Sequence, residues 1–200
     1  LVRGGSGSSR PAAIVVAGGR SSRLGGTPKA SLSNGSKTLL VSSLEAVATA
    51  RQRVVVGPSD LPVPADVKLT REDPPFSGPA AAITAGVRAL SPSCEWTCII
   101  AVDMPRIAEA IDTLLEATLQ APADIEGFFG VSGEIAQPLV GIYRTENLRR
   151  VFDTDTAHQS VRRFLRQLNL QAVPLDGGVT DDVDTWESAH ATGFDSPQWN

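Results

Sequence analysis

The sequence predicts a three-layer α/β fold in which helices cover both faces of a mostly parallel β-sheet. Short apolar runs rich in β-branched residues alternate along the chain with stretches whose apolar residues recur at helical spacing. Such short apolar runs are typical of strands that are buried on both faces. With 200 residues and 42% hydrophobic content, the chain is long enough to form one such domain around its own core.

In the first half of the chain, apolar runs are expected to form four strands, and the stretches between and after them three helices. The strands are predicted at 12–17, 53–56, 67–69 and 98–102, and the helices at 38–50, 79–90 and 107–119. In the first of these helices, the apolar residues 40, 44, 47 and 48 fall on one face. Pro79 follows Gly78 and suits the first position of the second helix.

The second half predicts a hairpin, a helix, a strand and a final short helix. Ser132 and Gly133 form a turn between segments at 128–131 and 135–143. Ser160 is a candidate N-cap for a helix whose inward residues are Val161, Phe164, Leu165 and Leu168. A strand is expected at 169–173, and the last helix begins at 184–185. We therefore divide the chain into a flexible segment rich in Gly and Ser at 1–11, one domain at 12–192 and a tail at 193–200.

The composition excludes several classes of protein. A net charge of −4 gives the chain no long-range attraction to nucleic acid or to anionic lipid. It contains no stretch of 18 apolar residues, and its first ten residues lack the apolar core of a secretion signal. We therefore expect a cytoplasmic protein with no nucleic-acid or membrane partner. Cys94 and Cys98 do not have the spacing of a zinc site, and Cys98 is expected to be a buried free thiol.

A loop rich in glycine and in cations follows the first predicted strand. Residues 16–29 read VAGGRSSRLGGTPK. The backbone N–H groups of Gly18 and Gly19 can approach a phosphate closely because these residues have no side chain. Arg20, Arg23 and Lys29 add positive charge in an acidic chain, which favours a small polyanionic ligand. The loop has neither the G-x₄-G-K-[ST] pattern of a Walker A loop nor the G-x-G-x-x-G of a dinucleotide site.

Asp103 comes directly after the predicted strand at 98–102. Ligands of parallel sheets bind beyond the carboxyl ends of the strands, so Asp103 and the glycine-rich loop are expected to meet at one edge. A carboxylate in that position suits Mg²⁺, which binds one or two carboxylates together with phosphate oxygens. The sequence therefore predicts a magnesium-dependent nucleotide site, which requires Lys29 and Asp103 to face one cleft.

The loop resembles the signature of the molybdenum cofactor guanylyltransferases and their nucleotidyltransferase relatives, which is roughly L-A-G-G-x-S-x-R-M-G-x-D-K. The chain departs from this pattern at Val16, Leu24 and Pro28, and it keeps Ala17, Gly18, Gly19, Ser21, Arg23, Gly25 and Lys29. Later segments also resemble the family. Residues 73–79 are similar to D-x₄-G-P-L-A-G, 103–105 to D-M-P, and 137–144 to Q-P-L…Y-R. Residues 182–185 resemble N-x-N-T, with Asp182 and Asp184 in both Asn places.

The resemblance implies a Rossmann-like nucleotidyltransferase fold and the transfer of GMP from GTP to the terminal phosphate of the molybdenum cofactor, molybdopterin. It implies that Asp103 holds Mg²⁺ and that Arg23, Lys29 and Asp103 are catalytic. The implied partners are GTP, molybdopterin and, transiently, molybdoenzymes or chaperones. The residues expected to bind the nucleotide are Val16, Ala17, Gly18, Gly19, Ser21, Arg23, Lys29, Gly57, Asp73, Gly78 and Asp103.

Two alternatives stay open. Pro28 and the D-x-D-T segment favour another nucleotidyltransferase, such as a cytidylyltransferase or a sugar-nucleotide pyrophosphorylase. A regulatory nucleotide-binding protein without catalysis is less favoured, because Lys29, Asp73 and Asp103 are all present. Whatever the base, a phosphate acceptor is favoured over a sugar hydroxyl, since a phosphomonoester with a second pKa near ~6 ionises without a general base. The basic residues at 162, 163 and 166 are interpreted as a solvated face.

Overall fold

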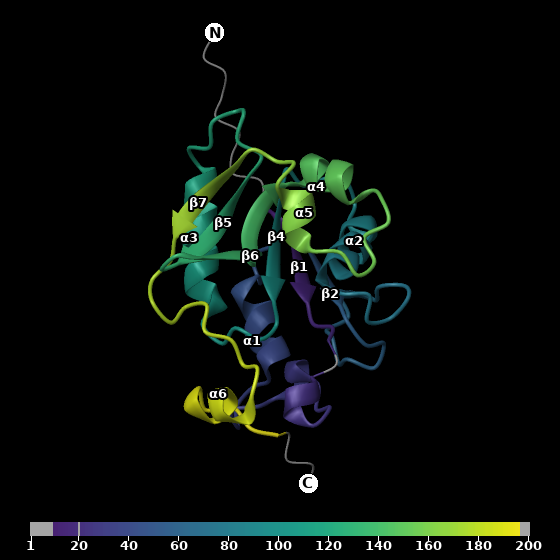
Figure 1. The fold of residues 1–200 in the computed structure, drawn as a ribbon, viewed down its shortest axis with the longest axis vertical. Coiled ribbons are helices and arrows are strands. Elements are labelled where there is room, and N and C mark those ends of the chain that lie inside the picture. The colour runs from purple at the N-terminus through teal and green to yellow at the C-terminus, as the bar shows by residue number, and fades with distance from the viewer. Residues whose placement is uncertain (1–9, 20, 197–200) are drawn as a thin grey trace.

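Seven strands form one sheet in the order β3-β2-β1-β4-β6-β5-β7 within the described part of the chain (Figure 1). The structure is a computed structural model that describes residues 10–19 and 21–196. The strands are β1 Ala12–Val16, β2 Gln52–Val56, β3 Lys68–Thr70, β4 Trp96–Ala101, β5 Gly127–Ser132, β6 Ile135–Arg144 and β7 Leu170–Pro174. All seven lie within a few residues of the segments where the sequence predicts strands.

The sheet is mostly parallel, as predicted, with β6 as the reversed strand. Strand β1 pairs in parallel with β2 and β4, β2 with β3, and β5 with β7. Strand β6 is antiparallel to both β4 and β5, because it returns from β5 through the predicted hairpin turn. A register shift between Phe129 and Gly130 bends β5 against β6.

The helices form a layer on each face of the sheet, which confirms the three-layer prediction. Helices α1 (Leu39–Ala46) and α3 (Ile107–Thr118) pack on one face against side chains such as Val15 and Ile100. Helices α2 (Pro79–Ala89), α4 (Thr145–Phe152) and α5 (Val161–Leu165) pack on the other face, against Ile14 and Ile99. The short helix α6 (Trp186–Ala191) lies beyond the lower end of the sheet in Figure 1.

The ends of several helices differ from the prediction for local reasons. Helix α1 begins after Thr38, whose side chain accepts a hydrogen bond from the Val41 N–H, and it ends at Ala46 rather than at residue 50. Ser160 precedes α5 as predicted, but its side chain makes no capping hydrogen bond and the helix ends at Leu165. Helix α4 was not predicted, because it follows β6 without a break and spans only eight residues.

Helix α2 lies unusually close to the central strand β1. A Cβ atom added to Gly86 would lie 2.6 Å from Cγ2 of Ile14, so this contact requires a glycine.

Near the other end of the chain, Phe194 is buried in the core and Ser33 pairs with Asp195. The predicted tail at 193–200 therefore begins with residues that pack on the domain. The rest of the tail, at 197–200, lies outside the described residues, as do residues 1–9 of the predicted flexible segment and Arg20.

The topology brings the predicted site segments to one edge. Val16 ends β1 and pairs in register with Ala101, which ends the parallel neighbour β4. The Val102 N–H continues the ladder by donating to the Val16 carbonyl at 3.0 Å. The glycine-rich loop and Asp103 therefore leave the sheet side by side.

None of the helices in the described residues is both long and apolar enough to cross a membrane. Cys98 is a buried free thiol, as predicted.

Candidate active site

A cleft of about 900 Å³ lies at the carboxyl ends of β1 and β4. Of the residues that the sequence assigns to nucleotide binding, nine line this cleft: Val16, Ala17, Gly18, Gly19, Ser21, Arg23, Lys29, Gly78 and Asp103. Gly57 and Asp73 are not among its lining residues. Lys29 and Asp103 face one cleft, so the structure meets the requirement that the sequence analysis set for a nucleotide site.

The glycine-rich loop is anchored to the domain by apolar side chains and by two short 3₁₀ turns. The first turn, Ser22–Leu24, buries Leu24 almost completely and ends at Gly25, which has a left-handed φ of 63°. The second turn, Lys29–Ser31, follows Pro28 and buries Ala30. Because the chain is fixed on both sides of Lys29, its side chain enters the cleft from a defined position.

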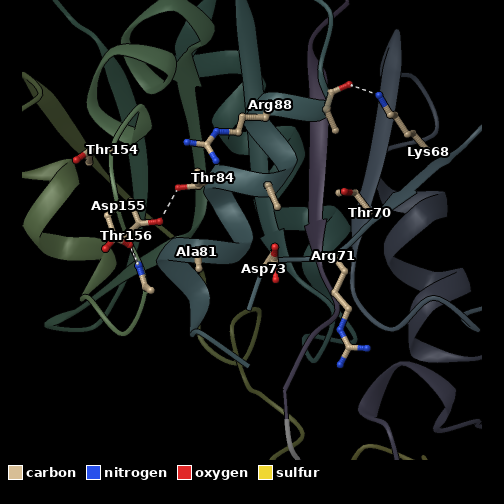
Figure 2. Close-up of a pocket in the computed structure, with 13 residues that line it drawn as sticks. Lys68, Thr70, Arg71, Asp73, Ala81, Thr84, Arg88, Thr154, Asp155 and Thr156 are labelled. Atoms are coloured by element: carbon tan, nitrogen blue, oxygen red, sulfur yellow. Dashed lines mark hydrogen bonds between the residues drawn. The ribbon is translucent and has the colours of Figure 1, made fainter. Parts of the chain in front are cut away.

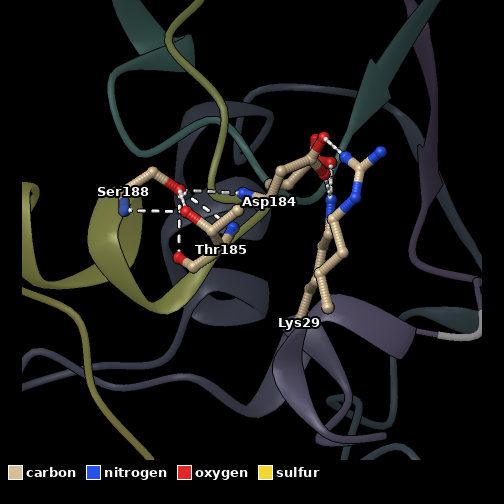
Figure 3. Close-up of polar contacts among 6 residues, drawn as sticks. Lys29, Asp184, Thr185 and Ser188 are labelled. Atoms are coloured by element: carbon tan, nitrogen blue, oxygen red, sulfur yellow. Dashed lines mark hydrogen bonds and ion pairs between the residues drawn. The ribbon is translucent and has the colours of Figure 1, made fainter.

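Lys29 bridges two carboxylates that come from distant parts of the chain (Figure 3). Its Nζ donates to Asp103 Oδ2 at 2.7 Å and also to Asp184 Oδ1. Arg23 Nη1 donates to the second oxygen of Asp184 at 3.3 Å. Burial lowers the pKa of Lys29 and is the largest single effect, but the charges and hydrogen bonds of both aspartates raise it, and the net pKa lies above the ordinary value. Lys29 is therefore a fixed cation at neutral pH.

Three carboxylates gather beside this lysine. Oxygens of Asp103, Asp182 and Asp184 all lie within 4.8 Å of one another. Burial raises the pKa of Asp182 above its ordinary value, and the negative charges of Asp184 and Asp103 add to the shift. One oxygen of the group, Asp103 Oδ1, is buried and has no hydrogen-bond partner in the part of the chain that the structure describes.

Local hydrogen bonds hold the two late aspartates against Asp103. The Val183 N–H, between them, donates to the Asp103 carbonyl at 2.9 Å. Thr185 caps helix α6 in a reciprocal arrangement with Ser188, whose Oγ also accepts from the Asp184 N–H at 3.0 Å (Figure 3). The D-x-D-T sequence before a capped helix is the signal for this arrangement. The segment resembles a motif of the family, but Asp182 and Asp184 are not among the site residues predicted from the sequence.

The residues fit a divalent magnesium ion. Mg²⁺ prefers hard oxygen ligands, and the cluster offers three carboxylates, one with a buried oxygen that lacks a donor. The Lys29 ammonium partly neutralises the negative charge of this cluster through its ion pairs with Asp103 and Asp184. Asp103 is therefore a candidate ligand, as the sequence predicts, and Asp184 and Asp182 are candidates that the structure adds.

Neighbouring acidic residues after β3 point into different cavities. Glu72 lines the cleft, whereas the exposed Asp73 lines a second cavity of about 570 Å³ against α2 (Figure 2). That cavity also contains Lys68, Arg71 and Arg88. The resemblance places Asp73 at the nucleotide, whereas Glu72 is not among the residues predicted from the sequence. Gly57 packs behind the loop, donating its N–H to the Thr70 carbonyl at 2.9 Å.

A glycine-rich loop with cations and a carboxylate cluster, at the carboxyl edge of a Rossmann-like sheet, are the features expected of a domain of the nucleotidyltransferase class. The chain belongs to the MobA-like NTP transferase domain family, which it matches over residues 13–173. Asp182 and Asp184 lie beyond the matched segment.

Comparisons with individual proteins agree with this class. The chain is 29% identical over 185 residues to a probable molybdenum cofactor guanylyltransferase of Rhodopirellula baltica, covering 86% of each protein. Its fold is similar to that of a homologue of Mycobacterium tuberculosis Rv0371c from Mycobacterium sp. strain JC1, with a TM-score of 0.74, 19% identity and coverage of 92% and 96%. It is also similar to molybdopterin-guanine dinucleotide biosynthesis protein A from Archaeoglobus fulgidus, with a TM-score of 0.67, 18% identity and coverage of 91% and 96%. At these identities the solved structures establish the fold.

Proposed function

We propose that the chain transfers GMP from GTP to the terminal phosphate of molybdopterin, releasing pyrophosphate and forming molybdopterin guanine dinucleotide. The observation that carries the proposal is the convergence of Lys29, Asp103 and Asp184 in a cleft beside the glycine-rich loop. The guanylyltransferase name of the Rhodopirellula relative supports the choice of GTP and molybdopterin. We propose the same cytoplasmic location that the composition favours.

Binding of the triphosphate is assigned to the loop. Gly18 and Gly19 are exposed at the cleft, so their backbone N–H groups are accessible to phosphate oxygens. Lys29 and Arg23 are the cations that can exchange an aspartate oxygen for a phosphate oxygen. These fixed charges neutralise the negative charge that builds on the leaving pyrophosphate, which is the main electrostatic demand of the reaction.

We assign the magnesium ion to Asp103 and Asp184, with Asp182 beside them. A bound Mg²⁺ withdraws charge from phosphate oxygens and orients them. The protein's own contribution is to hold these carboxylates together against their mutual repulsion. It does so through the Val183 hydrogen bond to Asp103, the cap of α6 and the Lys29 ammonium.

The acceptor needs no general base from the protein. A phosphomonoester is largely ionised at neutral pH. The described residues that line the cleft include no histidine or cysteine. This composition favours a phosphate over a hydroxyl as the nucleophile. The arginines at 162, 163 and 166 are not among the described lining residues of the cleft, which supports their interpretation as a solvated face.

The test is an assay of pyrophosphate release. The purified chain is incubated with Mg²⁺, molybdopterin or its molybdenum form, and GTP, CTP or ATP in turn. The proposal predicts release with GTP and a product that contains GMP joined to the pterin phosphate. Release with CTP alone would make the chain a cytidylyltransferase, and release only with a sugar phosphate would replace the acceptor.

A further inference from the structure

The carboxylate of Glu72 is buried at the wall of the cleft and only half of it is satisfied. The side chain lines the cleft although the residue is only 6% exposed. Its Oε1 accepts a hydrogen bond from the Phe76 N–H at 2.9 Å. Its Oε2 is buried and has no hydrogen-bond partner among the described residues. Buried acceptors are nearly always paired in native proteins, so this oxygen is a candidate acceptor for a donor on a ligand.

Gly18 leaves open the space next to that carboxylate. A Cβ atom added to Gly18 would lie 3.7 Å from both Oε1 and Oε2 of Glu72. The backbone φ of Gly18 lies outside the left-handed region, so its conformation does not demand glycine. A side chain at this position would lie between the cleft and the carboxylate, because Gly18 is exposed at the cleft and its Cβ would contact Glu72.

The chemistry of the carboxylate limits what can bind there. An ionised carboxylate only accepts hydrogen bonds, so its partner must present N–H or O–H donors. Strand β3, which leads to Glu72, lies three strand spacings from β4, which leads to Asp103, or about 14 Å. A nucleotide held by its phosphates at Lys29 and Asp103 therefore offers its nucleoside end to Glu72.

We propose that Glu72 reads the nucleobase and selects guanine, with Gly18 leaving room for the base edge. Guanine presents two adjacent donors, N1–H and N2–H, which match a carboxylate. Adenine and cytosine each place a ring-nitrogen acceptor next to their amino group, and a carboxylate repels that acceptor. This inference rests on the proposed use of GTP and assigns its base selectivity to named residues.

The assignment differs from the one that the resemblance implies. Glu72 and Asp73 are adjacent in the loop that follows β3, but they line different cavities. Glu72 enters the cleft and Asp73 enters the second cavity. The residue that reads the base is thus the one before the aspartate of the motif.

The test measures equilibrium binding of GTP, ITP, ATP and CTP with Mg²⁺ and without an acceptor. ITP lacks the N2 amino group and isolates one of the two donors. The variants are Glu72→Gln, Gly18→Ala and Asp73→Asn. Glu116→Gln, an exposed glutamate on α3, is the matched control. Binding is measured by calorimetry, and circular dichroism reports whether each variant is folded.

The wild type is expected to bind GTP most tightly and ITP more weakly. Glu72→Gln is expected to weaken GTP binding by about ten- to a hundredfold, the effect of losing a hydrogen bond to a charged group, and to change ATP and CTP binding by less than about threefold. Gly18→Ala is also expected to reduce the preference for GTP, and Glu116→Gln is expected to bind the four nucleotides as the wild type does. If Glu72→Gln does not fold, the GTP preference of Gly18→Ala decides whether the inference stands.

Three results would overturn the inference. The first is a preference for GTP that is unchanged in both Glu72→Gln and Gly18→Ala, and the second is a preference that is lost only in Asp73→Asn. The third is a wild-type protein that shows no preference for GTP. Because the measurement needs no acceptor, it separates base selection from catalysis. A failure to form the molybdopterin product would refute the proposed reaction and leave this result standing.

Discussion

Cations line two cavities of the molecule, the cleft at the carboxyl ends of β1 and β4 and the second cavity against α2. The charged groups of the two cavities are arranged differently. In the second cavity, two of the described cations contact groups of the fold itself. Lys68 donates to the Ala89 carbonyl at 3.0 Å, and the Arg71 guanidinium lies 5.1 Å from the centre of the Phe76 ring. In the cleft, the partly buried ammonium of Lys29 joins Asp103 and Asp184.

This difference shows what marks a site in this molecule. Basic residues alone do not distinguish the two cavities, because Lys68, Arg71 and Arg88 outnumber the described cations of the cleft. The cleft is distinguished by two buried acceptors, Asp103 Oδ1 and Glu72 Oε2, to which no described residue donates a hydrogen bond. Such atoms are costly when unpaired, so their presence at one cavity indicates ligands that complete them.

The largest expected effect comes from removing the central carboxylate. Asp103→Asn keeps the size of the side chain and removes its charge. We expect the rate of pyrophosphate release to fall by more than about a hundredfold, since loss of groups that merely support metal ligands already costs about 10–100-fold. Turnover is measured with GTP, Mg²⁺ and acceptor, and thermal unfolding shows that the variant is folded. Unchanged release would refute the role of Asp103.

Replacing the bridging lysine is the next sharpest test of the comparison. Lys29→Met retains the apolar stem and removes the charge. We expect kcat/KM for the nucleotide to fall by about 10–100-fold, with a higher KM and a lower kcat, because the triphosphate loses a cation. Mg²⁺ alone is expected to raise the Tm of the variant more than that of the wild type, since Lys29 no longer competes for Asp103 and Asp184. A smaller metal-induced shift in the variant would contradict this competition.

The carboxylate cluster predicts a pH-dependent cost in stability. The pKa of Asp182 in the folded chain lies above its ordinary value of 3.8, so ionising it costs stability as the pH rises through that pKa. In metal-free buffer, Asp182→Asn is expected to be more stable than the wild type at pH 7 by less than about 1 kcal/mol, because the exposed group is screened by solvent. The advantage is expected to vanish as the pH falls toward 3.8. Denaturant unfolding at several pH values measures it, and a constant difference would exclude the electrostatic cause.

The smallest effect is expected in the second cavity. Arg88→Ala removes an exposed cation there and leaves the cleft untouched. We expect kcat/KM for GTP to stay within about threefold of the wild type, as is usual for surface substitutions away from a site. Steady-state kinetics beside Lys29→Met provide the measurement. A loss as large as that of Lys29→Met would erase the distinction between the two cavities.

The sequence predicts much of this architecture because the relevant signals are local. Runs such as 53–56 and 98–102 are apolar and β-branched, and the loop after the first strand has its glycines and cations in one segment. The meeting of Lys29 with Asp103 follows from parallel topology, because the ends of β1 and β4 share an edge. Helix α4 is missed because its apolar residues 148, 151 and 152 make too short a pattern directly after a strand.

The rest depends on contacts that no local pattern encodes. Asp184 is distant from Asp103 in the sequence and reaches it through the Val183 hydrogen bond to the Asp103 carbonyl. Whether Glu72 or Asp73 lines the cleft depends on the path of the loop after β3, which no local pattern encodes. The resemblance implies an acidic residue near the nucleotide, and the fold places Glu72 at the cleft.

We propose that the cleft, and not the second cavity, holds a metal-bound nucleotide between Lys29 and Asp103. The decisive measurement is a crystal structure of the chain soaked with GTP and Mg²⁺. We expect an ion against Asp103 and Asp184, phosphate oxygens against Lys29, and the base edge at Glu72. Nucleotide density beside Arg88 and Asp73, or an ion away from Asp103, would contradict it.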